Sequence, residues 1–314
     1  MKKLFNIFSK GAGKRGIAVL IAGVLVFGGM VSYAAFSRNL DTADNAEPIV
    51  EEPISESKVS NTENGITIQA EKILREKELQ DKADGIELNS ELDSKLKDAG
   101  NVRLDNGYRR MIAEKDIPEK QRKQLELSII NSADPQTALV MFDYLHDNYF
   151  TFSDLDTALA RYESGESAEN ILQGYLDIEM QRQAKDYAVG EIDDLIKNRG
   201  LSIDDLRIAE ILEAHGAAEF DVITEKLGSG ESWEDIAAEL ELLNGTGVVR
   251  SFVINEDDII ECSEALGISN AQAIRRLSVM QKAGIDESAA VEYVKSDKPA
   301  ARAVKASAES RLTR

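Results

Sequence analysis

An uncharged run from Gly16 to Ser37 limits the folds open to this chain more than any other feature of its sequence. At about 1.5 Å per helical residue, a run of this length spans the roughly 30 Å of bilayer hydrocarbon. Lysine and arginine precede it in residues 1–15, whereas acidic residues follow it. This asymmetry predicts a short basic tail in the cytoplasm and a C-terminus outside. We therefore expect residues 16–37 to form a single transmembrane helix.

A cleaved signal peptide is the alternative interpretation of the same run. Ser32-Tyr33-Ala34, followed by Ala35, fits the pattern of small residues that precedes a cleavage site. A signal peptide usually has an apolar core of about 7–15 residues, and the longer run here favours a retained helix or an uncleaved signal anchor. Cleavage near Ala34 would give a secreted protein. Both interpretations put most of the chain on the extracytoplasmic side of a bacterial-type membrane.

The remaining chain has the composition of an all-α protein. Hydrophobic residues make up 43% of the chain, while aromatic residues make up 6% and there are only 5 prolines, which favours helical packing over a β-sandwich. Residues 38–64 are acidic, contain two of the prolines and lack a helical period, so they predict a disordered stalk. Residues 65–135 mix Glu and Lys at helical spacing. We expect charged, solvated connector helices there, interrupted near Gly85 and Pro118.

Two copies of one pattern occur within residues 136–245. The chain has SGESAENI from Ser164 to Ile171 and SGESWEDI from Ser229 to Ile236. When the copies are aligned, the apolar positions on both sides of the turn also match. The pattern predicts a domain of tandem helical hairpins, in which one amphipathic helix ends near Gly and the next begins at Ser.

Serines at the expected helix starts have two interpretations, as helix caps or as catalytic nucleophiles. A nucleophile elbow requires G-x-S-x-G after a strand, but Glu169 and Glu234 occupy the position of the second Gly. A Ser hydroxyl before a helix accepts a hydrogen bond from a free N–H group of the first turn. We therefore expect five structural caps, at Ser153, Ser167, Ser202, Ser232 and Ser269.

The content of histidine and cysteine argues against several kinds of catalysis. His146, His215 and Cys262 are the whole supply of these residues, which is too few for a typical structural zinc site. HExxH, Walker A and GxGxxG motifs are absent from the sequence. We expect no metal, no cofactor and no catalytic residue, and a buried, apolar environment for Cys262. An envelope enzyme that uses an Asp/Glu pair in a helical cleft remains an alternative, since such pairs leave no local pattern.

The C-terminal part of the sequence divides into a helical module, residues 246–298, and a basic tail, residues 299–314. Three short helices are expected in the module, from Asp257 onward. The stretch EALGISNAQAIRRL has the turn glycine and the basic second helix of a helix-turn-helix, which leaves a membrane-bound regulator as a further alternative. The tail lacks a strong apolar face, so we expect it to be solvated.

These features together favour a protein that binds another protein and catalyses no reaction. The formal net charge of −20 argues against a nucleic-acid partner, because phosphate binding requires a basic surface. No small-molecule substrate is indicated. We expect an interaction or scaffold module, anchored by residues 16–37, that binds another protein of the cell envelope. Aromatic side chains dominate many interfaces, and the candidates for partner binding are Trp233, Tyr162 and Tyr175.

Overall fold

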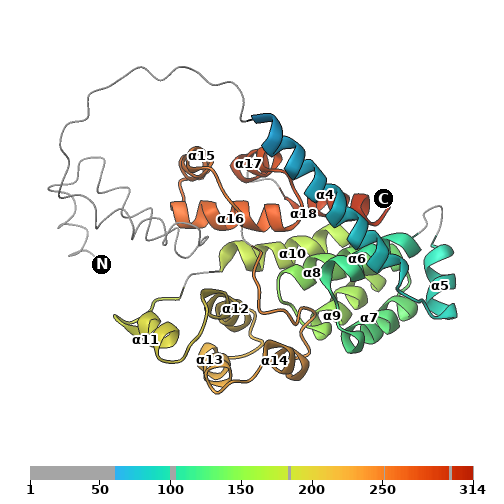
Figure 1. Cartoon of the computed structure of the whole chain (residues 1–314), viewed down its shortest axis with the longest axis horizontal. Helices are drawn as coiled ribbons and strands as arrows, with labels where there is room; N and C mark the ends of the chain where they lie inside the picture. Colours follow the sequence, from blue (N-terminus) through green and yellow to red (C-terminus); the bar gives the residue numbers. More distant parts are fainter. Residues whose placement is uncertain (1–60, 100–103, 183–184, 251, 297–298, 314) are drawn as a thin grey trace.

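The computed structural model describes residues 61–99, 104–182, 185–250, 252–296 and 299–313. Over these residues the regular secondary structure is helical and no strand occurs, so the predicted all-α class is confirmed (Figure 1). The helices are α4 (Asn61–Asp84), α5 (Ser90–Lys97), α6 (Asp105–Lys115), α7 (Glu119–Asn131), α8 (Pro135–Asp147), α9 (Phe152–Glu163), α10 (Ala168–Gln181), α11 (Glu191–Lys197), α12 (Ile203–Ala214), α13 (Phe220–Gly228), α14 (Trp233–Glu239), α15 (Glu256–Leu266), α16 (Asn270–Lys282), α17 (Glu287–Ser296) and α18 (Ala301–Leu312).

Helix α8 is the centre of the larger of two hydrophobic cores. Every residue from Thr137 to His146 is buried, so the helix has no solvent face. A helix that is apolar on all sides has to be enclosed by other elements. Helices α7, α9, α10 and α18 pack around it, and the larger core extends through α5 to α10 and α15 to α18.

The smaller core is formed by α11 to α14. It also contains Tyr149, Leu242 and Val249, which come from the segments that connect it to the larger core. The predicted hairpin region, residues 136–245, is therefore shared between the two cores. Its first hairpin, α9–α10, belongs to the larger core and its second, α13–α14, to the smaller one.

The two SGES turns have the same geometry, and both join the helices of a hairpin. In the first turn Gly165 has a φ of 98° and its N–H donates to the carbonyl oxygen of Tyr162 (2.9 Å). In the second turn Gly230 has a φ of 93° and donates to Leu227 (2.9 Å). Glycine adopts this left-handed conformation without a steric penalty. The repeated tetrapeptide is thus a helix–turn–helix connection, as the sequence pattern predicts.

Four of the five predicted serine caps form in the structure. In each, the side-chain oxygen accepts from the backbone N–H three residues later, and the four are Ser167, Ser202, Ser232 and Ser269. The prediction for Ser153 is wrong. Helix α9 begins two residues earlier than expected, because Thr151 and Asp154 form a reciprocal capping box there and Phe152 becomes buried in the larger core. Ser153 is an exposed residue in the first turn of the helix.

Replacing the true cap of α9 is expected to destabilise the protein, whereas the same change at Ser153 is not. Thr151→Ala removes the oxygen that accepts from the Asp154 N–H (3.1 Å) and should cost about 1–2 kcal/mol. Ser153→Ala should change stability by less than about 0.5 kcal/mol, as exposed substitutions usually do. Urea-induced unfolding of the two variants measures the difference. Equal losses would contradict the assignment of the cap to Thr151.

Helices α5 to α7 are not the solvated connectors that the sequence predicts. The expected breaks are present, since α4 ends at Asp84 and Pro118 precedes α7. However, the sparse apolar residues of these helices, among them Leu92, Leu125 and Ile129, are completely buried in the larger core. Their charged residues set the low mean hydropathy of the segment, while the few apolar positions face α8 or its neighbours.

The C-terminal tail is also not solvated. The three helices expected in residues 246–298 form as α15 to α17, and they are followed by α18, which packs on α6, α8 and α10. Its buried side chains are mostly small, namely Ala301, Val304, Ala308 and Leu312. Small side chains give a weak hydropathy signal but allow close packing. At the closest approach, Gly107 of α6 lies directly against the backbone of Leu312.

A methyl group at Gly107 is expected to separate α18 from α6. A Cβ atom there would overlap the carbonyl group of Leu312, and backbone atoms cannot rotate away. Gly107→Ala should therefore cost about 1–3 kcal/mol, the usual range for overpacking. Gly174→Ala in α10 is the matched control, because the nearest atom to its Cβ would be a guanidinium nitrogen 4.0 Å away. The control should be neutral or stabilising by up to about 1 kcal/mol. A neutral Gly107→Ala in thermal unfolding would refute the close contact.

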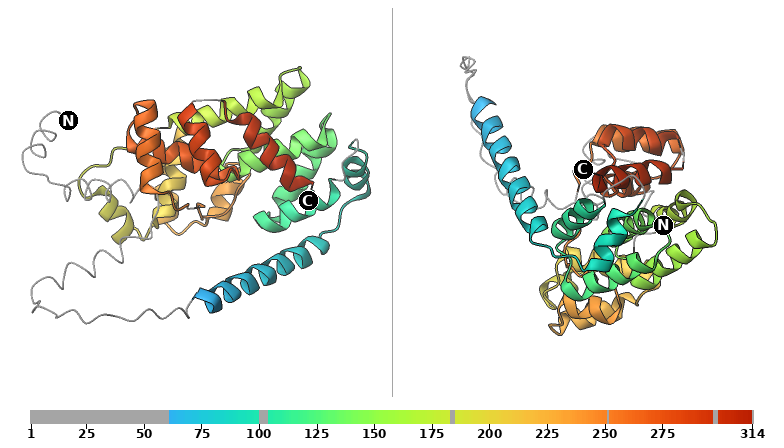
Figure 2. Two further views of the ribbon diagram at one scale, coloured as in Figure 1. Left: turned by 90° about the horizontal axis from the view of Figure 1, so that it is seen from above. Right: turned by 90° about the vertical axis from the view of Figure 1, so that its right-hand side faces the viewer.

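Helix α4 packs on α6, and its N-terminal end projects away from the other helices (Figure 2). Ion pairs connect Glu76 with Arg110 (2.6 Å) and Lys82 with Asp116 (3.8 Å). Residues 61–64, predicted as the end of the disordered stalk, belong to this helix, so the prediction is wrong there.

The predicted basic tail, membrane helix and most of the stalk lie outside the described residues, since they occupy residues 1–15, 16–37 and 38–60. Among the helices that the structure describes, none combines the length and the hydropathy of a membrane span.

Candidate functional site

The three aromatic residues predicted to bind a partner make internal contacts. Trp233 donates from Nε1 to a carboxylate oxygen of Asp205 (2.6 Å), and Gly247 packs against its indole ring. Tyr175 is buried in the larger core. The hydroxyl of Tyr162 donates to Asp134 (3.2 Å). The structure does not bring these side chains together on one surface, and it gives each of them a role in joining helices.

The first polar site lies in the larger core, where α8 carries two acidic residues. Lys115 of α6 is buried between Asp143 and Asp147, and its Nζ is 3.0 Å from Oδ1 of Asp143. Arg311 of α18 pairs with the second oxygen of Asp143. Arg250 reaches Asp147 from the loop before α15 (3.5 Å). We call these five residues the Lys115 cluster. It ties three elements, α6, α8 and α18, to one another.

The charges of the Lys115 cluster stabilise each other. Burial alone would raise the pKa of Asp143 and of Asp147. The charge of Lys115, together with Arg311 at Asp143 and with His146 and Arg250 at Asp147, outweighs burial and lowers both pKa values below their usual range. Burial opposes the charge on Lys115, yet the two carboxylates raise its pKa. All three groups are therefore ionised at neutral pH. None of these carboxyl groups holds a proton that it could donate as a general acid.

His146 lies beside this cluster and is not arranged as a catalytic base. Its Nδ1 is 3.1 Å from Oδ1 of Asp147. Burial and the charge of Lys115 lower the pKa of the imidazole. No serine or cysteine among the described residues is hydrogen-bonded to either histidine, so a nucleophile–base pair is not formed in this part of the chain.

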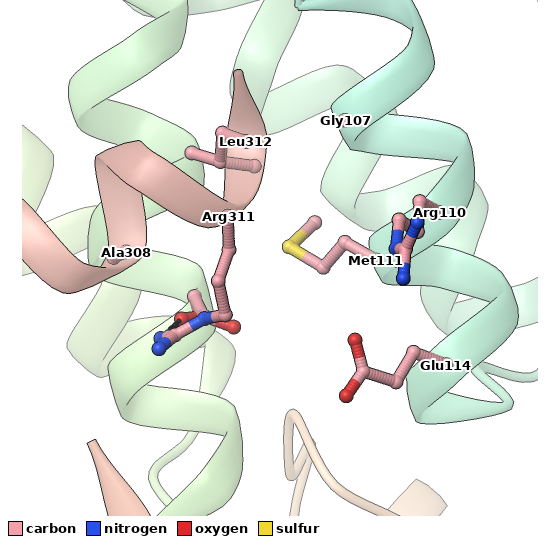
Figure 3. A pocket seen from close by; sticks show the side chains of 8 residues that line it. Gly107, Arg110, Met111, Glu114, Ala308, Arg311 and Leu312 are labelled. Atoms are coloured by element: carbon pink, nitrogen blue, oxygen red, sulfur yellow. Dashed lines mark hydrogen bonds and ion pairs between the residues drawn. The ribbon is translucent and has the colours of Figure 1, made fainter. Parts of the chain in front are cut away.

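A small cleft opens beside the Lys115 cluster, between α6 and α18 (Figure 3). Arg110 and Glu114 of α6 stand across it from Arg311, and the side chain of Met111 points into the space between them. The volume is about 200 Å³, which is below the 300–1,000 Å³ typical of small-molecule sites. Its charged groups are already paired: Arg110 with Glu76 (2.6 Å), Glu114 with Arg250 (3.4 Å) and Arg311 with Asp143.

The second polar site joins the two cores. Glu179 of α10 accepts a hydrogen bond from Nε2 of His215, the residue that ends α12 (2.6 Å). The imidazole stacks on the ring of Phe150, with centroids 4.0 Å apart and planes 9° from parallel. Arg182 lies 3.8 Å from both Glu179 and Glu210. Burial alone would raise the pKa of Glu179, but the hydrogen bond from His215 and the charge of Arg182 lower it to about 2.

Two basic residues of α16, Arg275 and Lys282, face the same place, and they interact electrostatically with Glu179. We call the whole set the junction cluster: Glu179, Arg182, Arg207, Glu210, His215, Arg275 and Lys282. It brings together α10 and α16 of the larger core with α12 of the smaller one. Arg275, one of the two basic residues of the predicted helix-turn-helix, is partly buried here.

Metal binding has no candidate in the described part of the chain, where no three His, Cys, Asp or Glu side chains are grouped to hold an ion. Cys262 is completely buried, as expected. Comparisons with protein-family models, curated proteins and solved structures find no match to this chain. Its function therefore has to be inferred from charge, exposure and geometry.

Sequence reasoning missed the acidic residues of both clusters, although one signal was present. Asp143 and Asp147 are four residues apart in the apolar stretch ALVMFDYLHD, so both fall on one face of a helix that is otherwise apolar. Buried acids require partners, and this spacing pointed to a shared cation. Glu179 gave no such signal. It lies in an amphipathic helix pattern, where an acidic residue on the polar face is common.

Loss of the cation in the Lys115 cluster is expected to destabilise the protein strongly and in a pH-dependent way. Lys115→Met leaves Asp143 and Asp147 buried without a counter-charge, which should cost about 3–5 kcal/mol at pH 7. Both carboxyl groups have lowered pKa values in the folded state, so the stability they provide is present above their ordinary value of 3.8 and is lost as the pH falls below it. The difference from the parent protein should therefore shrink in acid.

Lys123→Met is the matched control for this measurement, because Lys123 pairs with Glu119 at an exposed position. It should cost less than about 1 kcal/mol at any pH. Urea-induced unfolding at pH 7 and pH 3 compares the two variants. A Lys115→Met protein with parental stability at pH 7, or with the same loss at both pH values, would show that the carboxylates do not depend on this lysine.

Proposed function

We propose that this protein is a membrane-anchored interaction module of the cell envelope, without catalytic activity, that binds another envelope protein through helix α4. Residues 16–37 would hold it in the membrane with its helical body outside the cytoplasm. The charge asymmetry around this run supports that topology. The same topology places α4 close after the predicted anchor and stalk, between the membrane and the body.

The observation that carries the proposal is the exposure of two large aliphatic side chains on α4. Ile73 is 69% exposed and Leu74 is 60% exposed, at adjacent positions of α4, whose N-terminal end projects away from the other helices. Single exposed apolar residues are common on proteins. Two exposed aliphatic side chains next to each other on a projecting helix are instead an apolar surface that a groove in a partner protein can cover.

The state of the carboxyl groups supports the absence of catalysis. A carboxylate pair that works as acid and base needs one member with a raised pKa. In the Lys115 and junction clusters the pKa values of Asp143, Asp147 and Glu179 are all lowered. The pKa of Asp258 is raised by partial burial and by Glu287, but this residue lines neither the cleft beside the Lys115 cluster nor the shallow groove between α7 and α9.

Photo-crosslinking in intact cells tests the proposal. A crosslinking amino acid at position 73 of the full chain should give an adduct with a different envelope protein, and Leu74→Ser in the same chain should reduce it several-fold. The matched control is the crosslinker at Val253, an equally apolar residue that is 87% exposed but lies far along the chain from α4. No adduct is expected there.

Two results would refute the proposal. Equal adducts at positions 73 and 253, or adducts with a second copy of this chain alone, would show that α4 does not recognise another envelope protein. Protease added to protoplasts should also remove an epitope at the C-terminus. A protected epitope would contradict the extracytoplasmic topology while leaving the behaviour of α4 to the crosslinking result.

A further inference from the structure

The junction cluster collects positive charge inside an acidic protein. It contains four basic side chains from two helices, α12 and α16, and from the end of α10, namely Arg182, Arg207, Arg275 and Lys282. The carboxylates among them are Glu179 and Glu210. Arg207 has a further partner in Asp204 (3.6 Å), and Glu179 is shared with His215. Asp147 of the Lys115 cluster also acts on Lys282, so the four basic side chains face four carboxylates, although the whole chain has a net charge of −20.

Several donors of the cluster have no acceptor among the described residues. Lys282 is only 9% exposed and forms neither an ion pair nor a hydrogen bond with them. Arg275 forms none either. The Nε of Arg182 and the hydroxyl of Tyr144, which is 3% exposed, are buried without a hydrogen-bond partner. Buried polar groups in folded proteins are nearly always satisfied, so the Nε of Arg182 and the hydroxyl of Tyr144 lack the acceptor that such groups ordinarily have.

The lowered pKa values of Lys282 and Arg275 indicate that these cations lie near one another. Burial lowers the pKa of Lys282, and the charges of Arg182 and Arg207 lower it further against the opposite effect of Glu179. Burial and the charge of Arg182 lower the pKa of Arg275 to about 10. Arg182 is thus near both of the other basic groups. A buried charge without a partner costs several kcal/mol, and water molecules could satisfy the donors but could not neutralise them.

We propose that the junction cluster binds a small oxyanion of the phosphate class, held by Lys282, Arg275 and Arg182. Such an ion accepts several N–H donors at once and suits the planar donor array of arginine. It would neutralise Lys282 and Arg275, which form no ion pair with the described residues, and connect α10 and α16 of the larger core with α12 of the smaller core. The bound anion then stabilises the junction, and this stabilisation grows with the logarithm of the anion concentration above Kd.

The basic side chains of the site can bind free phosphate and a phosphate monoester equally well. The described residues place no group at the junction that would distinguish the two. Inorganic phosphate and glycerol 3-phosphate are therefore the two probes, and each is compared with chloride at constant ionic strength so that general screening is the same.

The full chain, purified in detergent, is titrated with each probe while its thermal unfolding and the probe's ³¹P line width are followed. The unfolding midpoint should rise with the logarithm of the probe concentration above Kd, and chloride should have no such effect. The broadening of the ³¹P line should show saturable binding. Binding of phosphate alone identifies the free ion as the ligand, and tighter binding of the ester identifies a phosphate ester. Both results support the proposal. No rise beyond that in chloride and no line broadening with either probe would overturn it.

Lys282→Met separates a binding role from a structural one. Without phosphate the variant should be as stable as the parent or more stable, because it removes an unpaired buried charge and leaves no partner behind. With phosphate its affinity should fall about tenfold or more, the loss expected for one charged hydrogen bond. Lys305→Met is the matched control, since Lys305 pairs with Glu309 on α18 (2.6 Å) away from the junction. It should retain the full response.

Arg275→Gln provides a second variant if Lys282→Met does not fold. It keeps the aliphatic base of the side chain and a polar N–H group, removes one cation and should also weaken phosphate binding about tenfold. Unchanged phosphate affinity in a folded Lys282→Met or Arg275→Gln protein would refute the assignment of the anion to this cluster.

Discussion

Complete burial of α8 is the constraint on which the larger part of the structure depends. A helix with apolar residues on every face cannot remain in water, so four other helices have to enclose it. This requirement accounts for the order of packing. The charged segments before α8 supply α7, the repeat supplies α9 and α10, and the last residues of the chain return as α18 to cover the remaining face. The Lys115 cluster follows from the same burial, because two carboxylates on α8 are enclosed with it and need cations from α6 and α18.

The two cores are joined by polar contacts more than by apolar ones. Residues 148–151 connect α8 to α9. In the segment after α14, the N–H of Leu243 donates to the carbonyl oxygen of Phe150 and the carbonyl oxygen of Glu241 accepts from the N–H of Phe152 (both 2.9 Å). Beside them His215 stacks on Phe150 and bonds to Glu179. Hydrogen bonds and ion pairs are directional, so they fix the orientation of the smaller core on the larger one. Their strength also depends on the charges nearby, which makes this junction sensitive to ions in a way that an apolar interface is not.

Local features of the fold could be predicted from the sequence, whereas the packing around α8 could not. The repeated turns and the caps at Ser167 and Ser232 depend on a few adjacent residues, so the amino-acid pattern was sufficient. Ser153 was assigned wrongly because two candidate caps, Thr151 and Ser153, lie within one turn. Burial of Phe152, a contact with distant residues, decided between them. The buried role of α18 and the cation between Asp143 and Asp147 rest on pairs of residues far apart in the chain, such as Arg311 and Asp143. A single sequence contains no record of such pairs.

The smaller core has a further weakness that follows from its construction. Besides the side chains of α11 to α14 it takes Tyr149, Leu242 and Val249 from the connecting segments, so it is complete only while those segments are held against the larger core. Tyr149 itself adopts a left-handed conformation, with a φ of 59°, and its hydroxyl donates to the carbonyl oxygens of Thr246 and Val248 (3.0 and 2.8 Å). A bulky residue keeps this conformation only where its surroundings enforce it. Loosening the junction would therefore release Tyr149 and open the smaller core first, while α8 and its surrounding helices stayed folded. An anion at the junction cluster would oppose that opening from the other side of the same contact, by drawing α12 toward α10 and α16.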